Sequence, residues 1–246
     1  MYIKIKKVIK SIFPQNIIIQ NELFIRKIYS LFYYGNIYKC NICNCNLRQF
    51  VKNERNDLVC PNCGSLNRDR KLWHIINENY LPNANTILDF SPSRCFNRKM
   101  KSLKNINYFS TDLSGNFLAD YKYDITKIDC ETEKFDLIIC YHILEHIIED
   151  LKAMKELHRV LKKNGVLVIQ TPFKDGEIYE DSLIKSENDR LLHFGQEDHV
   201  RIYSKTGLKT RLESISFEVN VINFKEKNNN TNGFLELETV LICSKI

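Results

Sequence analysis

The strongest constraint on the fold is an alternation of two apolar patterns between residue 86 and the C-terminus. Short runs rich in β-branched and aromatic residues alternate with longer stretches whose apolar residues recur at helical spacing. The β-rich runs are 86–90, 107–112, 135–141, 165–171, 217–224 and 238–246. Strands that alternate with helices favour a doubly wound, mostly parallel α/β sheet, which we predict over residues 80–246.

One helix of this domain can be placed from its apolar spacing. It is predicted between residues 149 and 163, and its apolar face consists of Leu151, Met154, Leu157 and Leu161. Asn164 and Gly165 are expected to stop it, because glycine commonly follows the last turn of a helix.

The net charge of +6 is unevenly distributed. Residues 1–39 hold seven Lys and Arg against the single acid Glu22, whereas the other 207 residues hold 29 basic and 29 acidic groups. Within that remainder, residues 76–246 are slightly acidic, with 23 basic and 26 acidic groups. A basic groove for long nucleic acids across the main domain is therefore disfavoured.

Residues 1–35 form a basic leader with two apolar stripes at helical spacing, in 3–13 and 24–32, the second ending at Gly35 as a C-cap. The favoured interpretation is two helices that pack on the next domain. The alternative is contact of residues 1–13 with an anionic membrane surface. We find neither a secretory signal nor an apolar run long enough to span a membrane, so a cytoplasmic protein is expected, and its nine cysteines are expected to be thiols or metal ligands.

Two Cys-x-x-Cys pairs, separated by sixteen residues, lie in residues 36–75. The four cysteines are Cys40, Cys43, Cys60 and Cys63. Two such knuckles complete a tetrahedral shell of four sulfurs, which predicts a zinc ribbon. Because four protein ligands leave no open position for water, the zinc is expected to be structural. Cys45 is a spare thiol beside this set.

Two acids mark the ends of the first two predicted strands. Asp89 closes the first and is followed by small residues, and Asp112 closes the second, 23 residues later. An acid at that distance is typical of a group that accepts hydrogen bonds from a ribose diol. The loop at 91–94 has no glycine, so it is not expected to reach positive φ freely, and Pro92 lacks an N–H donor. Such a loop argues against a dinucleotide cofactor, whose pyrophosphate needs these donors.

In these stretches the chain resembles the class I S-adenosylmethionine-dependent methyltransferases, and in particular a bacterial subgroup with an N-terminal zinc ribbon. The resemblance is most specific in residues 136–172, with Leu144-Glu-His146, and in residues 194–203, and the subgroup's Pro-containing loop matches Ser91-Pro92-Ser93. It implies a seven-stranded, Rossmann-like sheet with S-adenosylmethionine as the cofactor.

The resemblance also implies cofactor contacts at Asp89, Phe90, Ser91, Ser93, Asp112, Asp124, Ile125, Cys140, Tyr141 and His142. Asp89, Phe90, Ser91 and Ser93 would hold the methionine end of the cofactor, and Asp112 the ribose hydroxyls. Asp124 and Ile125 would contact the adenine, and Cys140, Tyr141 and His142 would line the sulfonium side. A strand-end cap at Asp112 and a plain turn at Asp124 are the alternatives.

Residues 193–201 concentrate two histidines, two acids and an arginine where such enzymes carry acceptor-side groups. His199 is the candidate general base, and Arg201 the candidate anchor for an anionic acceptor. The alternative is a loop that only packs on its own domain.

The predicted function is methyl transfer from S-adenosylmethionine to a small molecule or a sugar of a glycan. The basic leader and the ribbon favour a second interpretation, an RNA base methyltransferase, which the acidic main domain disfavours. A third is a binding or scaffold protein with an inactive fold, suggested by the glycine-free loop. The sequence leaves the oligomeric state open.

Overall fold

The computed structural model describes residues 21–226 and 229–245. The first predicted leader helix and the membrane contact through residues 1–13 lie outside the described residues. The chain divides into two compact units, each built from segments that are separated in sequence. The cysteine unit comprises Met1–Asn79, Ser93–Leu103 and Lys225–Leu237, and the sheet unit comprises Tyr80–Pro92, Lys104–Phe224 and Glu238–Ile246. Two segments of the predicted 80–246 domain thus belong to the cysteine unit.

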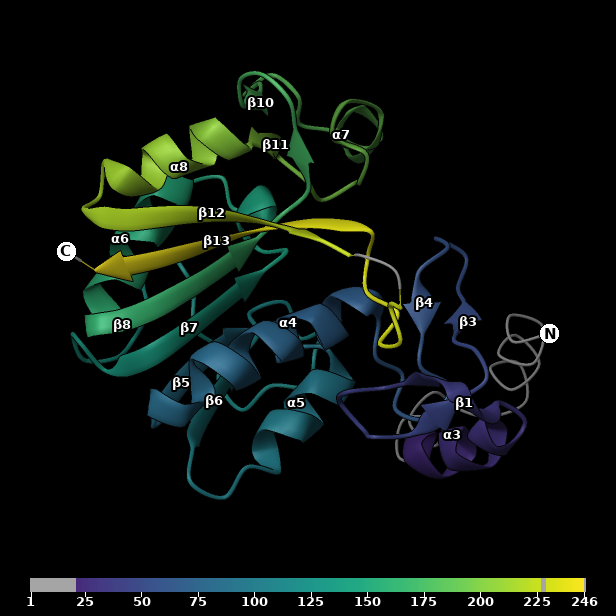
Figure 1. Cartoon of the computed structure of the whole chain (residues 1–246). Helices are drawn as coiled ribbons and strands as arrows, with labels where there is room; N and C mark the ends of the chain where they lie inside the picture. The colour runs from purple at the N-terminus through teal and green to yellow at the C-terminus, as the bar shows by residue number, and fades with distance from the viewer. Residues whose placement is uncertain (1–20, 227–228, 246) are drawn as a thin grey trace. The chain divides into compact units, whose positions relative to one another are not determined.

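The sheet unit contains a six-stranded sheet in the order β12-β13-β8-β7-β5-β6 (Figure 1). Its strands are β5 (Thr86–Phe90), β6 (Asn107–Thr111), β7 (Phe135–Tyr141), β8 (Leu161–Gln170), β12 (Phe217–Lys225) and β13 (Leu237–Lys245). The four strands β6, β5, β7 and β8 run parallel to one another, and β13 is antiparallel to β8. The predicted mostly parallel α/β sheet is confirmed.

The expected seventh strand is absent from the described residues. On the edge of β6 away from β5, the described residues form an isolated parallel bridge between Thr111 and Tyr121. The chain turns back directly afterwards, because the Lys127 amide donates to the Asp124 carbonyl and the Thr126 amide donates to the Asp124 side chain. This turn ends the pairing after one residue pair.

The core of the sheet unit lies around β7. Leu137, Ile138, Ile139 and Cys140 are consecutive and fully buried, which is typical of a central parallel strand covered on both faces. Two helices contribute to this core, α6 (Asp150–Val160) and α8 (Lys205–Glu213), the latter running along β12 (Figure 1). The predicted end of α6 at Asn164-Gly165 is wrong, because Leu161 is already extended and pairs with Phe135 of β7.

A smaller sheet in the same unit carries the predicted acceptor loop. Its order is β10-β11-β9, formed by β9 (Phe173–Lys174), β10 (Tyr179–Glu180) and β11 (Arg201–Ser204). Helix α7 (Glu187–Phe194) precedes β11 and ends at Gly195, whose φ of +83° is a conformation that favours glycine. The single turns η1 (Leu81–Asn83) and η2 (Leu144–His146) complete the unit.

The cysteine unit has two short antiparallel hairpins. They pair β1 (Tyr34–Lys39) with β2 (Asn46–Leu47), and β3 (Val51–Lys52) with β4 (Leu58–Val59). Its helices are α3 (Glu22–Leu31), α4 (Asn67–Asn79) and α5 (Arg94–Lys101). Paired hairpins that each present a Cys-x-x-Cys knuckle fit the predicted ribbon.

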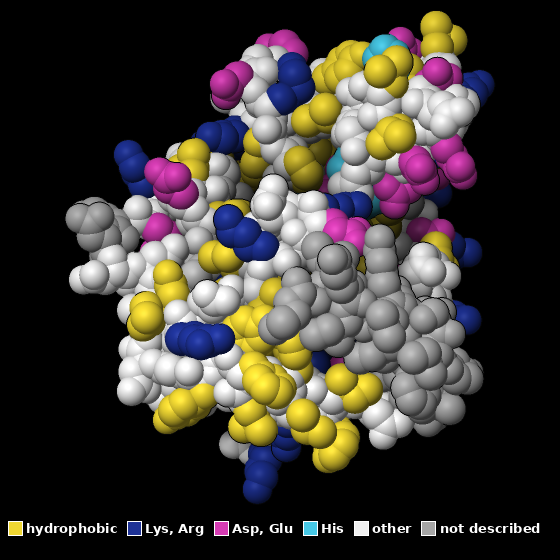
Figure 2. All heavy atoms as spheres, turned by 90° about the vertical axis from the view of Figure 1, so that its right-hand side faces the viewer, with side chains coloured by type: hydrophobic (Ala, Val, Ile, Leu, Met, Phe, Trp, Pro, Cys, Tyr) yellow, Lys and Arg dark blue, Asp and Glu magenta, His cyan; other side chains and the backbone are white. Residues whose placement is uncertain are grey.

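Helix α3 departs from its prediction in two ways. It ends at Leu31, with Phe32 as its C-cap, and Gly35 lies inside β1 instead of capping the helix. Its predicted packing stripe of Phe24, Ile28, Leu31 and Phe32 is between 48% and 74% exposed. Figure 2 shows hydrophobic side chains gathered on this face of the molecule. Among the described helices, none has the length and apolar character to cross a membrane.

Candidate active site

The carboxyl ends of the parallel strands bring most of the predicted cofactor residues to one edge of the sheet. Phe90 of β5 lies opposite Thr111 of β6, and Tyr141 of β7 lies opposite Gln170 of β8. Ligands of open α/β sheets bind beyond such carboxyl ends. This edge of the sheet unit is therefore the candidate active site.

Asp89 is the next-to-last residue of β5, close to this edge, and is only 2% exposed. The Tyr108 hydroxyl of β6 donates a 2.7 Å hydrogen bond to its Oδ2. Burial raises the pKa of Tyr108, and the neighbouring Asp89 raises it further, so this tyrosine remains a donor. The predicted contact of Asp89 with the methionine end would have to use its remaining acceptor positions.

The loop after β5 reaches a positive φ without glycine. Ser91 has a φ of +48°, its amide donates to the Thr111 carbonyl at 2.7 Å, and its hydroxyl donates to Asp112 Oδ1 at 2.8 Å. The loop was expected not to reach positive φ freely, and at Ser91 these two bonds hold the backbone there. Backbone strain of this kind clusters at binding sites. Ser93 caps α5 in the cysteine unit, where it accepts from the Phe96 amide.

Asp112 closes β6 with a well-held carboxylate that is 5% exposed as a residue. Ser114 donates to both of its oxygens, and the Phe117 amide donates to Oδ2 at 3.3 Å. Burial would raise the pKa of this carboxyl, but hydrogen bonds from Ser91, Phe117 and Ser114 outweigh it and lower the pKa. The residue is thus ionised, and its oxygens already accept from Ser91, Ser114 and Phe117. A ribose hydroxyl would have to replace one of these donors, so the ribose contact at this carboxylate remains a prediction.

Asp124 and Ile125, the predicted adenine contacts, have different surroundings. Asp124 is exposed and accepts from the Thr126 amide and hydroxyl, both at 2.8 Å, and these bonds lower its pKa. Ile125 is 5% exposed and packs in the core. The Asp124 side chain therefore forms a turn, as the alternative interpretation has it, and an adenine contact there remains a prediction.

The end of β7 carries a second strained residue. Cys140 is fully buried in the core, and burial raises the pKa of its thiol. His142 has a φ of +55°, and its amide donates to the Gln170 carbonyl at 2.8 Å. Its Nδ1 lies 3.2 Å from Oε1 of Glu145, which is 1% exposed. The strand end thus presents a histidine that is oriented by a buried carboxylate.

Several buried polar atoms near the ends of β7 and β8 have no hydrogen-bond partner among the described residues. They are Tyr141 Oη, Glu145 Oε2, Gln170 Oε1 and Thr171 Oγ1. An unpaired buried polar group costs about 1–3 kcal/mol, so a ligand that pairs it binds more tightly. Glu145, Gln170 and Thr171 are not among the site residues predicted from the sequence, although the position of the last two at the end of a central strand could have indicated them.

His199 lies beside His146 in the predicted acceptor loop. It is 4% exposed, and the two imidazole rings meet edge to face with centroids 4.7 Å apart. Asp198 does not pair with its sequence neighbour but with His146, whose Nδ1 is 3.3 Å from Asp198 Oδ2. Burial lowers the pKa of His199, and His146 lowers it further. The structure thus joins this loop to η2.

Arg201 does not fit the predicted role of an acceptor anchor. It is 5% exposed, and its guanidinium donates to the main-chain oxygens of Leu144, Ile147 and Ile148. It also forms an ion pair with Glu180 at 2.7 Å. Because these partners surround the guanidinium, Arg201 holds β11 to η2 and the residues after it.

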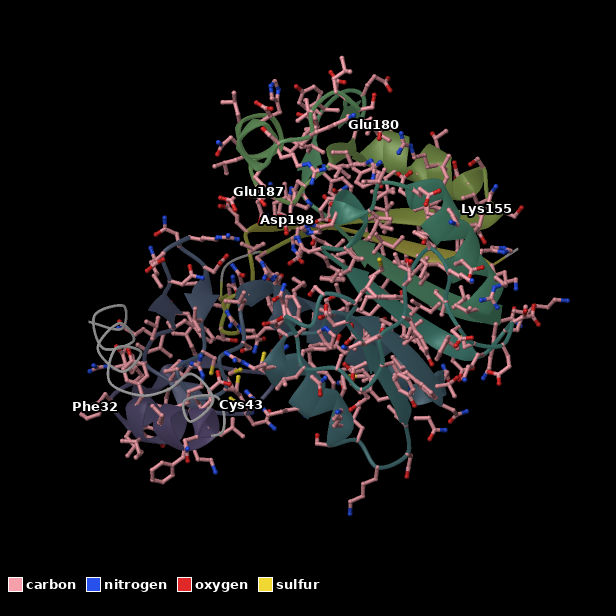
Figure 3. The ribbon with its side chains drawn as sticks, turned by 180° about the vertical axis from the view of Figure 1, so that it is seen from behind. Phe32, Cys43, Lys155, Glu180, Glu187 and Asp198 are labelled. Atoms are coloured by element: carbon pink, nitrogen blue, oxygen red, sulfur yellow. The ribbon has the colours of Figure 1, made fainter. Side chains whose placement is uncertain are left out.

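The four predicted zinc ligands meet in the cysteine unit. Cys40 Sγ lies 3.7 Å from Cys63 Sγ, and Cys43 Sγ lies 3.8 Å from Cys60 Sγ (Cys43 is labelled in Figure 3). Four sulfurs that are each about 2.3 Å from one zinc ion are about 3.8 Å apart, so the spacing matches a tetrahedral site. Hydrogen bonds from the other three thiols lower the pKa of Cys40 well below its ordinary value.

A family model described as a methyltransferase domain matches residues 65–220. The chain belongs to this methyltransferase domain family. The fold of its sheet unit is that of solved S-adenosylmethionine-dependent methyltransferases, and S-adenosylmethionine remains the predicted methyl donor. Membership favours an enzyme over the scaffold interpretation, whose main support was the glycine-free loop.

Solved structures with low sequence identity share the fold of this methyltransferase. One is a SAM-dependent methyltransferase from Archaeoglobus fulgidus, 15% identical with a TM-score of 0.52, which covers 74% of this chain and 95% of that one. Another is phosphoethanolamine N-methyltransferase 2 from Haemonchus contortus, in complex with phosphomonomethylethanolamine and S-adenosylhomocysteine. It is 14% identical with a TM-score of 0.53, and the match covers 73% of this chain and 53% of that one.

A curated relative matches a shorter stretch. It is the uncharacterized protein MJ0638 from Methanocaldococcus jannaschii, 33% identical over 91 residues, which are 34% of this chain. The chain spans 37% of the length of that relative.

The residues at the carboxyl edge fit S-adenosylmethionine. Asp112 would offer an ionised carboxylate to the ribose, and Ser91 forms the tight turn that a glycine usually forms after the first strand. The unpartnered hydroxyl of Tyr141 lies at the end of the adjacent central strand.

Proposed function

We propose that this methyltransferase methylates a hydroxyl group of a small molecule or of a sugar in a glycan. The observation that carries this proposal is a set of three buried polar atoms without partners among the described residues near the ends of β7 and β8, namely Tyr141 Oη, Gln170 Oε1 and Thr171 Oγ1. A polyhydroxylated acceptor supplies partners for them, whereas an apolar acceptor would leave them unpaired. The slight acidity of residues 76–246 also favours a neutral acceptor over a polyanion.

The experiment that tests this function supplies tritiated S-adenosylmethionine to the full chain with pools of small hydroxylated compounds, glycans or RNA. Label is expected in the first two pools. Label in RNA, together with RNA binding that weakens steeply with salt, would support the RNA base methyltransferase instead, because phosphate contacts release counterions.

S-adenosylmethionine, when bound, supplies an electrophilic methyl group on its sulfonium. Asp112 would hold its ribose, and the loop at Phe90 and Ser91 its methionine end. The reaction then depends on how well the acceptor oxygen is positioned and where its proton goes.

We assign the proton-accepting role to His142 in place of His199. His142 follows the central strand β7 at the candidate edge, and Glu145 Oε1 contacts its Nδ1, which leaves the other ring nitrogen to take a proton. His199, by contrast, is buried against His146.

Replacing His142 with asparagine is expected to lower turnover about 100-fold or more, the usual contribution of a general base. Affinity for S-adenosylhomocysteine, measured by calorimetry, should change little. His193→Asn is the matched control, because His193 lies in the same unit and contacts Tyr179 at 2.7 Å. Turnover by His142→Asn at the rate of the control would remove the assignment.

Asp112→Ala is expected to cost about 2–3 kcal/mol of S-adenosylhomocysteine affinity, because charge-assisted hydrogen bonds to the ribose are lost. Asp112→Asn should be milder, since its amide oxygen still accepts. Ser114→Ala is the control, because it removes only a hydroxyl that holds this carboxylate. Unchanged affinity of Asp112→Ala in calorimetry would place the ribose elsewhere.

We also propose that Cys40, Cys43, Cys60 and Cys63 hold a structural zinc ion. The sulfur spacing supports this, and so does the nearby Arg70, which is fully buried and donates to the main-chain oxygens of Ser65, Asn232 and Gly233. Burial lowers the pKa of Arg70, whereas Cys40 and Cys60 raise it. A buried cation beside four thiolates offsets part of their charge.

A further inference from the structure

A second cluster of metal-ligating side chains lies in the sheet unit. Glu145 and His146 of η2 and His199 of the loop before β11 each offer a ligand atom, and these atoms lie within 4.8 Å of one another. Glu145 and His199 are buried, at 1% and 4% exposure, and the side chain of His146 is 29% exposed. Figure 3 labels Asp198, which precedes His199 in this loop.

Two members of this cluster, Glu145 and His146, have one polar atom engaged by a neighbour. Glu145 Oε1 contacts His142, whereas Glu145 Oε2 is buried without a partner among the described residues. His146 Nδ1 lies 3.3 Å from Asp198 Oδ2. Metal-bound histidines are oriented in this way, through a carboxylate or a carbonyl on their other ring nitrogen.

The backbone holds the two segments of the cluster together. The Val200 amide, directly after His199, donates to the Glu145 carbonyl at 2.9 Å. Arg201 then bonds the Leu144 and Ile147 carbonyls on either side of Glu145 and His146. Because these bonds fix the main chain at all three ligands, the cluster is preorganised for binding.

Edge-to-face packing of His146 on His199 accounts for the contact of the two rings. It does not account for Glu145, whose second oxygen would remain buried without a partner. A cation bound by this oxygen and the two imidazoles would satisfy all three residues.

We propose that Glu145, His146 and His199 bind a first-row divalent transition metal such as Zn²⁺ or Fe²⁺. Two imidazoles and one carboxylate suit these ions, whereas Mg²⁺ and Ca²⁺ prefer oxygen ligands. Three protein ligands leave coordination positions open. If the proposed function holds, an acceptor oxygen takes an open position and is oriented by the metal, but metal binding itself does not depend on that function.

Cobalt is the probe that separates this site from the four cysteines. The full chain, loaded with a single equivalent of zinc that fills the four cysteines, is titrated with CoCl₂ and followed by calorimetry and visible absorption. We expect one further ion per chain with the absorption of nitrogen and oxygen ligands. Cobalt that replaced zinc at the cysteines would instead show the strong charge-transfer absorption of thiolates.

His199→Asn and Glu145→Gln should each lower the Co²⁺ affinity by about 100-fold or more, and Asp198→Asn by about tenfold, as for a group that orients a ligand. His193→Asn should match the wild type. Retained binding of S-adenosylhomocysteine shows that each variant is folded. No Co²⁺ bound outside the cysteines, or wild-type affinity in His199→Asn, would overturn the proposal. Co²⁺ binding without any methylation would leave the metal site standing and count against the proposed function alone.

Discussion

Replacing Cys60 with serine is expected to remove one zinc ion per chain and to unfold the cysteine unit at a much lower temperature. Structural zinc contributes about 10–16 kcal/mol of apparent binding free energy in zinc-finger peptides, and this free energy is coupled to folding. The cysteine unit depends on it because its hairpins are short, β2, β3 and β4 having two residues each. We therefore expect the free energy of unfolding of the cysteine unit to fall by several kcal/mol, which thermal unfolding measures. Elemental analysis measures the loss of zinc.

Cys45→Ser is the matched control for this experiment. Cys45 lies between the two knuckles but outside the group of four, and its thiol contacts only the neighbouring Asn46 carbonyl, at 3.6 Å, among the contacts described. Its replacement should leave both zinc content and unfolding temperature unchanged. A Cys60→Ser protein that keeps its full zinc content would contradict the four-cysteine site.

Replacing Arg201 with alanine is expected to lower the free energy of unfolding by about 3–5 kcal/mol, the cost of breaking a buried ion pair, here with Asp150, whose carboxylate lies 3.8 Å away and is 6% exposed. Its guanidinium joins β11 to Glu180 of β10 and to three main-chain oxygens around η2. Asp150 takes part in the same network, since the Tyr203 hydroxyl donates to it at 2.6 Å and Arg211 pairs with it. Urea denaturation measures the loss.

The control for Arg201→Ala is Lys209→Ala. Lys209 forms an exposed pair with Glu213 on α8, and such pairs contribute about 0.5 kcal/mol or less. An acceptor anchor at position 201 would give the opposite pattern, with normal stability and a raised KM for an anionic acceptor. That pattern would support the predicted role of Arg201 as an anchor for an anionic acceptor.

This network also predicts how stability depends on pH. Burial would raise the pKa of Glu180, but hydrogen bonds from Arg211 and Arg201 outweigh it and lower the pKa from its ordinary value of 4.5. A carboxyl whose pKa is lower in the folded state stabilises the protein above the unfolded value and loses this contribution as the pH falls through the folded value. The difference in stability between wild type and Arg201→Ala should therefore shrink below about pH 4.5.

The sequence alone determined the features that depend on local pattern. The strands β5 and β7 occupy the predicted residues. A short, mostly apolar run bounded by polar residues is typical of a central parallel strand and is too short for a buried helix. The four cysteines were recognisable from their spacing, since each knuckle is built within four residues. Asp89 and Asp112 were likewise located from the sequence, because each stands at the end of a short β-rich run.

The tertiary structure decided the features that depend on residues far apart in the chain. Arg201 is an internal ion-pair partner because β11 packs against η2, and Ser91 holds a positive φ because the end of β6 supplies its partners. Glu145 and His146 meet His199 only through the bonds between their two segments, and no periodicity in either segment encodes that meeting. Apolar period and ligand spacing are properties of a few consecutive residues, whereas the surroundings of a buried charge are set by whichever distant segment packs against it.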